Sequence, residues 1–373
     1  MDFGMDSSAE AVADVARDVF ARHESDWTSL FGGRVRAGES QEDSSPSYDG
    51  SDHPSYDGFD RNLWTALTDA GLLALPLPEA LGGDDLGVLG VLPLLRQLGS
   101  AAAVTPALGA LVSALFLQTV DDASRDRWAA TLTDGGWHAL AIGEPGDPLT
   151  STPRTTLRDG RLSGTKSGVL HADGASTLLV ASDAGVVAVA TAADGVSITR
   201  TPASSGWGEF TVRFDDVIVD DADVLAAEIS GLRDLYRLAL SAYADGLVAG
   251  ATRLTADHVS NRTQFGKPIA LFQAVGQQLA DIYVVGRSLN LSTTAAAWRL
   301  SEDLDAQQDL GIASYWTAAE IPAAMRTMTH LHGGVGVDLT YPLHRYFSIA
   351  KDLARLVGGA NARLDELADA SNP

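Results

Sequence analysis

Residues 261–273, NRTQFGKPIALFQ, bring together side chains that bind anions and flat rings. Arg262 offers a planar fork of donors that matches a pyrophosphate group. Phe265 provides an aromatic face, and Gln273 carries both a donor and an acceptor. The alternatives are a surface salt bridge for Arg262, core packing for Phe265 and a helix-surface position for Gln273.

A second stretch with chemical potential is HGGVG, residues 332–336. Gly333 and Gly334 lack Cβ atoms, so their backbone can come within hydrogen-bonding distance of a phosphate or an adenine ring. The alternative is a plain turn between two helices. Further upstream, residues 143–146 form a short GEPG loop.

Long helices are expected to carry these stretches. Apolar spacing predicts one helix over residues 232–260, about 43 Å long at 1.5 Å per residue. Further helices are expected over 272–300, 304–328 and 343–370. Long antiparallel helices with short connections form a bundle.

The beginning of the chain is also predicted to be helical. Helices are expected over residues 7–31, 59–73, 85–99, 104–119 and 122–132. Residues 36–58 interrupt this pattern with a tandem repeat, PSYDGSDH and then PSYDGFDR, and are predicted to be a flexible surface insertion.

Between the helical parts, residues 138–222 alternate Val, Thr, Leu and Ile with polar residues. Asp-Gly and Ala-Gly pairs mark hairpin turns, and several short strands with such turns predict a small barrel or sandwich. The fold class is therefore α+β. The expected domains are a helical domain (1–135), a β domain (136–222) and a four-helix bundle (223–373).

The charge balance and the lack of cysteine restrict the function. Acidic residues outnumber basic ones 49 to 26, a net charge of -23, which argues against nucleic-acid or anionic-membrane partners. Cysteine is absent, so thiol catalysis and thiolate metal sites are excluded, and we assign no metal site. Without a long apolar run or a basic leader, we expect a cytoplasmic protein.

The order of elements and three long motifs resemble the acyl-CoA dehydrogenase family. The motifs are NRTQFGKPIALFQ, HLHGGVGVDLTYPLHRYF and LWTALTDAGLLALPLPEALGG. The resemblance implies a helical domain, a β domain and a four-helix bundle. It also implies FAD at a dimer interface, with the ADP half held by the neighbouring subunit, and an electron-transfer flavoprotein as electron acceptor.

The resemblance assigns cofactor roles to specific residues. In the family, the positions of Arg262, Phe265, Gln273, Gly333 and Gly334 serve the FAD of the neighbouring subunit, with Phe265 on its adenine side. The family's usual Gln three residues before the first Gly is replaced here by His330, which can still donate one hydrogen bond.

The family's catalytic base is missing. These enzymes desaturate an acyl-CoA thioester, and a Glu removes the α-proton while the β-hydride goes to the flavin. Val357 occupies the base position of most relatives, followed by Gly358 and Gly359 in place of Gly-Thr. Tyr236 occupies the base position of a second branch, and its unperturbed pKa near 10 makes it a poor base.

The segments that hold a subunit's own flavin ring also depart from the family pattern. Pro148 and Leu149 replace small and polar residues in the loop after Gly143. Gly168 stands where the family has a Trp that covers the ring, and Leu170 where it has a Thr.

The changes therefore fall on a subunit's own ring and substrate, whereas the residues that reach the partner's cofactor remain. This pattern is typical of the non-catalytic partner in a heteromer. Some actinobacterial relatives that act on CoA thioesters of steroid side chains are α2β2 heterotetramers with one FAD per αβ pair. The leading hypothesis is such an FAD-sharing subunit, inactive alone, with the acyl-CoA bound mainly by a catalytic partner.

Two alternatives remain open at this point. One is a self-sufficient homotetrameric dehydrogenase whose base is Asp234 or Glu144, since Asp352 and Asp365 lie off the aligned position. The other is a flavin-free scaffold or binding protein derived from the family.

Overall fold

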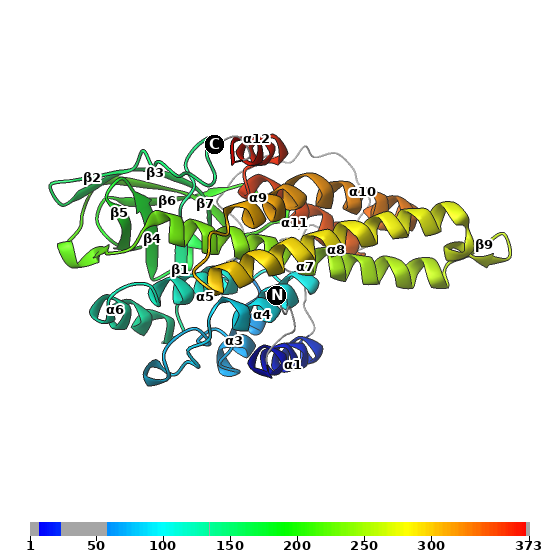
Figure 1. The fold of residues 1–373 in the computed structure, drawn as a ribbon, viewed down its shortest axis with the longest axis horizontal. Helices are drawn as coiled ribbons and strands as arrows, with labels where there is room; N and C mark the ends of the chain where they lie inside the picture. The colour runs from blue at the N-terminus through cyan, green and yellow to red at the C-terminus, as the bar shows by residue number, and fades with distance from the viewer. Residues whose placement is uncertain (1–6, 24–57, 134, 371–373) are drawn as a thin grey trace, which may run out of the picture.

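The computed structural model describes residues 7–23, 58–133 and 135–370, with helices at both ends of the chain and strands in its middle (Figure 1). This is the α+β arrangement that the sequence predicts. The predicted insertion, residues 36–58, lies outside the described residues except for Gly58, as does the predicted helix 7–31 beyond residue 23.

The N-terminal helices form one side of the molecule. They are α1 (Ser7–Arg22), α3 (Arg61–Asp69), α4 (Val88–Ser100), α5 (Ala107–Leu117) and α6 (Asp122–Thr133). Asp60 caps α3, because its carboxylate accepts a 2.9 Å hydrogen bond from the Leu63 backbone N–H. Nearly every residue of α5 is buried, so this helix is the central one of this part.

The middle of the chain forms two four-stranded sheets. One has the order β1 (His138–Ala141), β4 (Thr177–Ser182), β5 (Gly185–Ala190) and β8 (Val224–Leu225), and the other β2 (Thr156–Arg158), β3 (Arg161–Leu170), β7 (Glu209–Ile218) and β6 (Val196–Thr201). Only the β1–β4 pair of these strands is parallel. A predicted hairpin turn forms at Asp159-Gly160, whereas the turn expected at Ala184-Gly185 forms one residue earlier, at Asp183-Ala184, because Gly185 in β5 already pairs with Ser182.

The C-terminal helices form the predicted bundle. They are α7 (Ile229–Asn261), α8 (Gln273–Ser301), α9 (Gln307–Tyr315), α10 (Ile321–His332), α11 (Leu343–Leu356) and α12 (Ala360–Ala370). Helices α7 and α8 lie side by side and extend together beyond the rest of the molecule, ending at β9 (Figure 1). Among the described residues, no helix is long and apolar enough to cross a membrane.

Two predicted helices are each interrupted. The helix expected over 304–328 is divided by a π-helical turn, Trp316–Glu320, and α10 then continues to His332. The helix expected over 343–370 breaks at Gly358 and Gly359, which have φ of 95° and 79°. Only glycine adopts such angles readily, so α12 starts in a new direction.

Close contacts between α4 and α7 fix the position of the long helix. A Cβ atom on Gly99 would lie 1.8 Å from the Tyr243 carbonyl oxygen, and one on Gly246 would lie 1.8 Å from the Arg96 carbonyl oxygen. Arg96 Nε also donates to Asp245 at 2.6 Å. The middle of α7 is thereby held against α4, and its far end projects outward (Figure 1).

Candidate cofactor site

A two-residue hairpin turn lies at the projecting end of α7 and α8 (Figure 1). Strand β9 (Thr263–Gln264) pairs antiparallel with β10 (Lys267–Pro268), and Phe265 and Gly266 form the turn. Both turn residues have positive φ, 53° and 80°, as a type I′ turn requires. Such a turn prefers Asn-Gly, so a phenylalanine holds this backbone conformation at an energetic cost.

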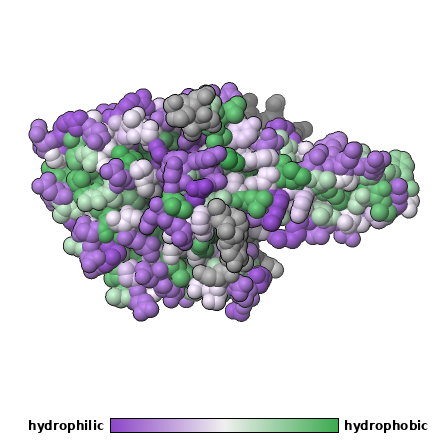
Figure 2. Space-filling model, in the orientation of Figure 1, coloured by the Kyte–Doolittle hydropathy of each residue, from purple (hydrophilic) through white to green (hydrophobic). Residues whose placement is uncertain are grey.

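The Phe265 side chain does not pack in the core of this chain, since it is 92% exposed. Its ring faces the edge of Phe272 with 6.3 Å between the ring centroids, and Lys267 Nζ lies 4.4 Å from the Phe272 ring centroid. Hydrophobic residues are visible at the tip of the projecting arm (Figure 2). An exposed aromatic side chain in a strained turn indicates a contact surface for a ligand or partner.

Arg262 and Gln273 flank this turn on the two helices. Arg262 caps the end of α7, where its backbone N–H donates to the His258 carbonyl oxygen at 2.9 Å, and Gln273 begins α8. Both side chains are exposed. Neither forms a hydrogen bond or an ion pair with any residue that the structure describes, so the donor fork of Arg262 is available to an anion.

The glycine pair lies at the end of α10. Gly333 caps this helix with φ 66° and ψ −141°, a conformation that a side chain would strain. A Cβ atom on Gly333 or Gly334 would meet no atom within 4 Å, so the backbone there faces open space. His330 is exposed on the last turn of the same helix. This opening fits the close approach of a phosphate or an aromatic ring.

Stacked histidine rings connect the two motifs. His258, one turn before Arg262, stacks on His332 with 4.3 Å between ring centroids. His332 Nδ1 donates to the Met328 carbonyl oxygen at 2.8 Å, so in the neutral ring Nε2 accepts from the Tyr341 hydroxyl at 3.2 Å. Burial lowers the pKa of both histidines. We call the exposed set Arg262, Phe265, Gln273, His330, Gly333 and Gly334 the clasp.

A second candidate site, the β3–α11 pocket, lies between the sheets and the bundle. It is a cavity of about 150 Å³. It is lined by Leu140, Gly143, Pro148, Ser167, Gly168, Thr201, Glu209, Tyr236, Arg355 and Leu356. The loop after Gly143 and the strand around Gly168 meet here, as the family resemblance predicts for a ring pocket.

Neither predicted base position carries a carboxylate that faces this pocket. Val357 is the C-cap of α11 and is fully buried. Tyr236 lines the pocket, and burial, followed by the nearby charge of Glu209, raises the pKa of its hydroxyl. A tyrosine with a raised pKa stays protonated at neutral pH and does not serve as a general base.

Glu144, an alternative base, is saturated by hydrogen-bond donors. Its carboxylate accepts from the backbone N–H groups of Arg154 and Thr155, from the Thr155 hydroxyl and from Lys166 Nζ, all at 2.8 to 3.0 Å. Burial by itself would raise the pKa of Glu144, but these bonds, that from Lys166 first, lower it to about 2. Glu144 thus holds the loop together.

The other alternative carboxylates also lie outside the lining of this pocket. Asp234 accepts a hydrogen bond of 2.5 Å from a glutamine on α9. Asp352 accepts the backbone N–H groups of Ser204 and Ser205 at 3.0 and 2.7 Å. Asp365 is exposed on α12.

The departures from the family pattern have clear structural consequences. Gly168 has φ 70° and lies at a register shift of β3, where it forms a bulge. Pro148 lines the β3–α11 pocket, whereas Leu149 is buried. Leu170 lines a separate cavity.

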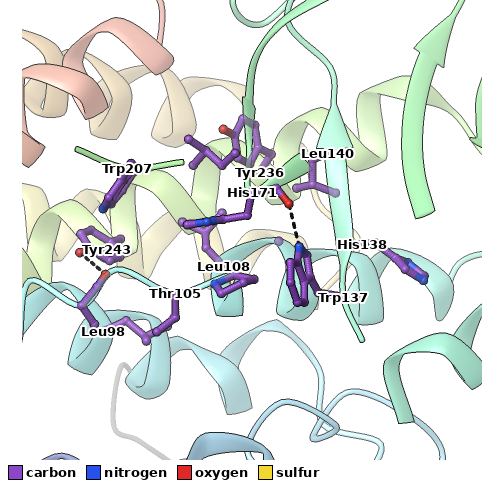
Figure 3. Close-up of a pocket in the computed structure, with 14 residues that line it drawn as sticks. Leu98, Thr105, Leu108, Trp137, His138, Leu140, His171, Trp207, Tyr236 and Tyr243 are labelled. Atoms are coloured by element: carbon purple, nitrogen blue, oxygen red, sulfur yellow. Dashed lines mark hydrogen bonds between the residues drawn. The ribbon is translucent and has the colours of Figure 1, made fainter. Parts of the chain in front are cut away.

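That separate cavity is almost filled by aromatic side chains (Figure 3). Trp137, His171, Trp207 and Tyr243 converge on it, and the remaining space is about 20 Å³, enough for about one water molecule. Trp137 Nε1 donates to the His171 carbonyl oxygen at 2.8 Å. We call this region the aromatic cavity. In its present form it has no room for an acyl chain.

Glu209 and Arg355 are site residues that the sequence analysis missed. They are 146 residues apart, and their side chains form an ion pair that borders the β3–α11 pocket. Glu209 begins β7 and is 2% exposed, whereas Arg355 lies near the end of α11 and is 46% exposed. No motif or spacing marks such a pair, because it depends on how the sheet and the bundle meet.

Comparisons with known proteins agree with this fold. The family described as Acyl-CoA dehydrogenase, C-terminal domain matches residues 231–370, and Acyl-CoA dehydrogenase, N-terminal domain matches residues 44–136. The chain is 47% identical over 307 residues to the acyl-CoA dehydrogenase FadE28 of Mycobacterium tuberculosis, covering 82% of this chain and 91% of that protein. The chain therefore belongs to the acyl-CoA dehydrogenase family, whose members are FAD-dependent oxidoreductases.

Two solved structures share this fold over nearly the full length of the chain. The ChsE4-ChsE5 complex from Mycobacterium tuberculosis superposes with a TM-score of 0.86 at 29% identity, covering 100% of both chains. A variant of the steroid acyl-CoA dehydrogenase Tcur3481-Tcur3483 superposes with a TM-score of 0.84 at 29% identity, covering 98% of both chains.

Proposed function

We propose that this chain is the non-catalytic, FAD-sharing subunit of a heteromeric acyl-CoA dehydrogenase. The observation that carries the proposal is the contrast between an exposed clasp and a pocket in which neither of the family's base positions holds a carboxylate. Arg262 and Phe265 project from the chain with their binding groups uncovered, whereas Val357 and Tyr236 occupy the base positions. The complex would desaturate an acyl-CoA thioester, and the resemblance to steroid-type enzymes favours a steroid side-chain CoA ester.

The clasp fits the ADP half of FAD. Arg262 would donate to the pyrophosphate as a bidentate fork, and Phe265 would pack on the adenine side. Gly333 and Gly334 would allow the backbone to approach the cofactor, and Gln273 and His330 would supply hydrogen bonds. When bound, FAD accepts the hydride of the reaction. The partner subunit would supply the base, the ring pocket and most of the acyl-CoA contacts.

The two alternatives find less support. A self-sufficient homotetramer needs a base, but Glu144 is saturated by donors, and neither Asp234 nor Asp352 lines the pocket. Glu209 does line it, but its carboxylate is paired with Arg355. A flavin-free scaffold would not need an exposed phenylalanine in a strained turn beside an unpaired arginine. Solved relatives named as two-chain complexes also favour a heteromer, and an electron-transfer flavoprotein would reoxidise the flavin of the pair.

The FAD-to-chain ratio tests the proposal. The chain is purified alone and together with a co-expressed catalytic acyl-CoA dehydrogenase subunit, and the flavin is measured by absorbance. We expect no flavin in the isolated chain and one FAD for each pair of unlike chains. One FAD per chain in the isolated protein would contradict the shared site and would favour a self-sufficient enzyme.

A further inference from the structure

The β3–α11 pocket is where this chain would hold a flavin ring of its own. Gly143 and Pro148 border it from the loop, and Ser167 and Gly168 border it from strand β3. In the family resemblance these two segments surround the ring. The contents of this pocket therefore decide whether the chain can bind a second cofactor.

The Arg355–Glu209 ion pair lies at this pocket. The Glu209 carboxylate is almost completely buried, and burial raises the pKa of Glu209 while the charge of Arg355 opposes that shift. Arg355 also lies 3.8 Å from Asp352. A buried carboxylate needs a cation or several donors, so the guanidinium is held at the pocket wall rather than free in solvent.

Gly168 provides the space that Arg355 and its neighbour use. A Cβ atom on Gly168 would lie 3.2 Å from Leu356 Cδ2 and 3.9 Å from Arg355 Nη1. The family's tryptophan at this position would displace both side chains, and the φ of 70° would strain it as well. The glycine and the ion pair are therefore complementary features of one arrangement.

The remaining volume is too small for a tricyclic ring. The cavity of about 150 Å³ is roughly half the lower limit of about 300 Å³ for ligand sites. A ring could enter only if Arg355 moved away. Glu209 would then remain buried without its partner, which is unfavourable for an ionised carboxylate.

We propose that the Arg355–Glu209 ion pair is a plug that excludes a flavin ring from this chain's own pocket. The plug limits each pair of unlike chains to the single FAD that the clasp shares with the partner. This inference rests on the proposed function, since it concerns the second pocket of the same complex.

The test uses the purified complex with its bound FAD and compares the wild type with the double variant Arg355→Ala/Glu209→Gln. Lumiflavin, which carries the tricyclic ring without an ADP half, is titrated in, and quenching of its fluorescence is recorded. We expect saturable quenching in the double variant. Its lumiflavin dissociation constant should be lower than that of the wild type by about tenfold or more, a difference of about 1.4 kcal/mol. The control is Arg158→Ala/Asp183→Asn, which removes another Arg–carboxylate pair outside this pocket.

The possible results distinguish a failure of the plug from a failure of the proposed function. Equal, weak quenching in the wild type and the double variant would overturn the plug, while one FAD per pair in the wild type would leave the shared site intact. Two FAD per pair in the wild type would overturn both. If the double variant does not assemble, the single variant Glu209→Gln, which keeps the side-chain shape, decides: tighter lumiflavin binding than wild type supports the plug, and equal binding rejects it.

Discussion

The clasp and the β3–α11 pocket lie in one chain, but among the described residues polar side chains are exposed and unpaired in the clasp and paired with each other in the pocket. In the clasp, Arg262 forms no ion pair with the described residues, and the backbone at Gly333 faces open space. In the pocket, Glu209 and Arg355 pair with each other, and the Tyr236 hydroxyl has a raised pKa. Groups left unpaired at a surface are available for binding, whereas paired groups are already satisfied.

Under the proposed function, this difference would let a family with one site in each subunit give rise to a pair of unlike subunits. A site built from two chains has two halves that can change independently. In the proposed complex, a valine at position 357 would remove the base from one half without disturbing the clasp, which lies on another part of the bundle. We therefore expect the exposed clasp and the buried parts of the chain to respond differently to acid, to substitution and to added ligand.

The largest expected effect is acid destabilisation of the sheets and the aromatic cavity. Burial lowers the pKa of His138 to about 4, and burial together with the charge of Arg200 lowers that of His171 to about 3. In the unfolded chain both histidines bind protons with a pKa near 6.5. The free energy of unfolding is therefore highest above that pH and falls as the pH drops toward the pKa values of the folded chain. Each histidine should contribute a loss of roughly 2 kcal/mol between pH 7 and 5.

Urea unfolding at pH 7, 6 and 5 measures this effect. The double variant His138→Gln/His171→Gln should flatten the decrease in unfolding free energy, whereas His330→Gln in the exposed clasp should leave it unchanged. An unfolding free energy that stays constant from pH 7 to 5 would show that neither buried histidine resists protonation.

Arg262→Ala should produce the next largest effect, now on the clasp. Loss of charge-assisted hydrogen bonds to the pyrophosphate should weaken FAD binding by the complex roughly tenfold to hundredfold. Equilibrium dialysis of the complex against FAD measures this, with Arg213→Ala on strand β7 as a matched exposed arginine. Equal FAD affinity in the two variants would show that Arg262 does not contact the cofactor.

The long elements of the fold were predictable from sequence. The expected helices 232–260 and 272–300 agree with α7 and α8 within a few residues, since apolar periodicity over many turns leaves little ambiguity. The Gly358-Gly359 break could have been found, because two adjacent glycines rarely continue a helix. The π turn at Trp316–Glu320 has no such signal.

The clasp residues could be named from sequence because they lie in two short motifs. Their exposure could not be predicted, since phenylalanine is usually a core residue, and the 92% exposure of Phe265 follows from its place in the hairpin turn. The Arg355–Glu209 pair was beyond sequence reasoning, because it requires the packing of α11 against β7 across 146 residues. Contacts between distant segments depend on tertiary structure, which local patterns do not encode.

Phe265→Asn should separate stability from binding at the clasp. Asparagine suits the type I′ turn with Gly266, so the unfolding free energy should rise by about 0.5–1 kcal/mol. The same change removes the aromatic face and should weaken FAD binding about threefold to tenfold. Thermal unfolding and FAD titration of one preparation measure both effects, and Tyr283→Asn, an exposed aromatic within α8, is the control. A stabilised variant with full FAD affinity would mean that the phenylalanine serves another partner.

Val357→Glu should have the smallest effect on activity, although it restores a carboxylate at the family's base position. The side chain at this position is fully buried at the end of α11, Gly168 still leaves the ring strand without its tryptophan, and the ion pair still lines the β3–α11 pocket. A base without an ordered flavin and an acyl chain within reach cannot accelerate proton removal. Anaerobic loss of flavin absorbance after acyl-CoA addition should therefore stay at background in the isolated variant supplied with FAD, as in the uncharged control Val357→Gln under the same conditions. Substantial flavin reduction by Val357→Glu alone would show that this half-site lacks only its base, and the contrast between the two regions would then reduce to one residue.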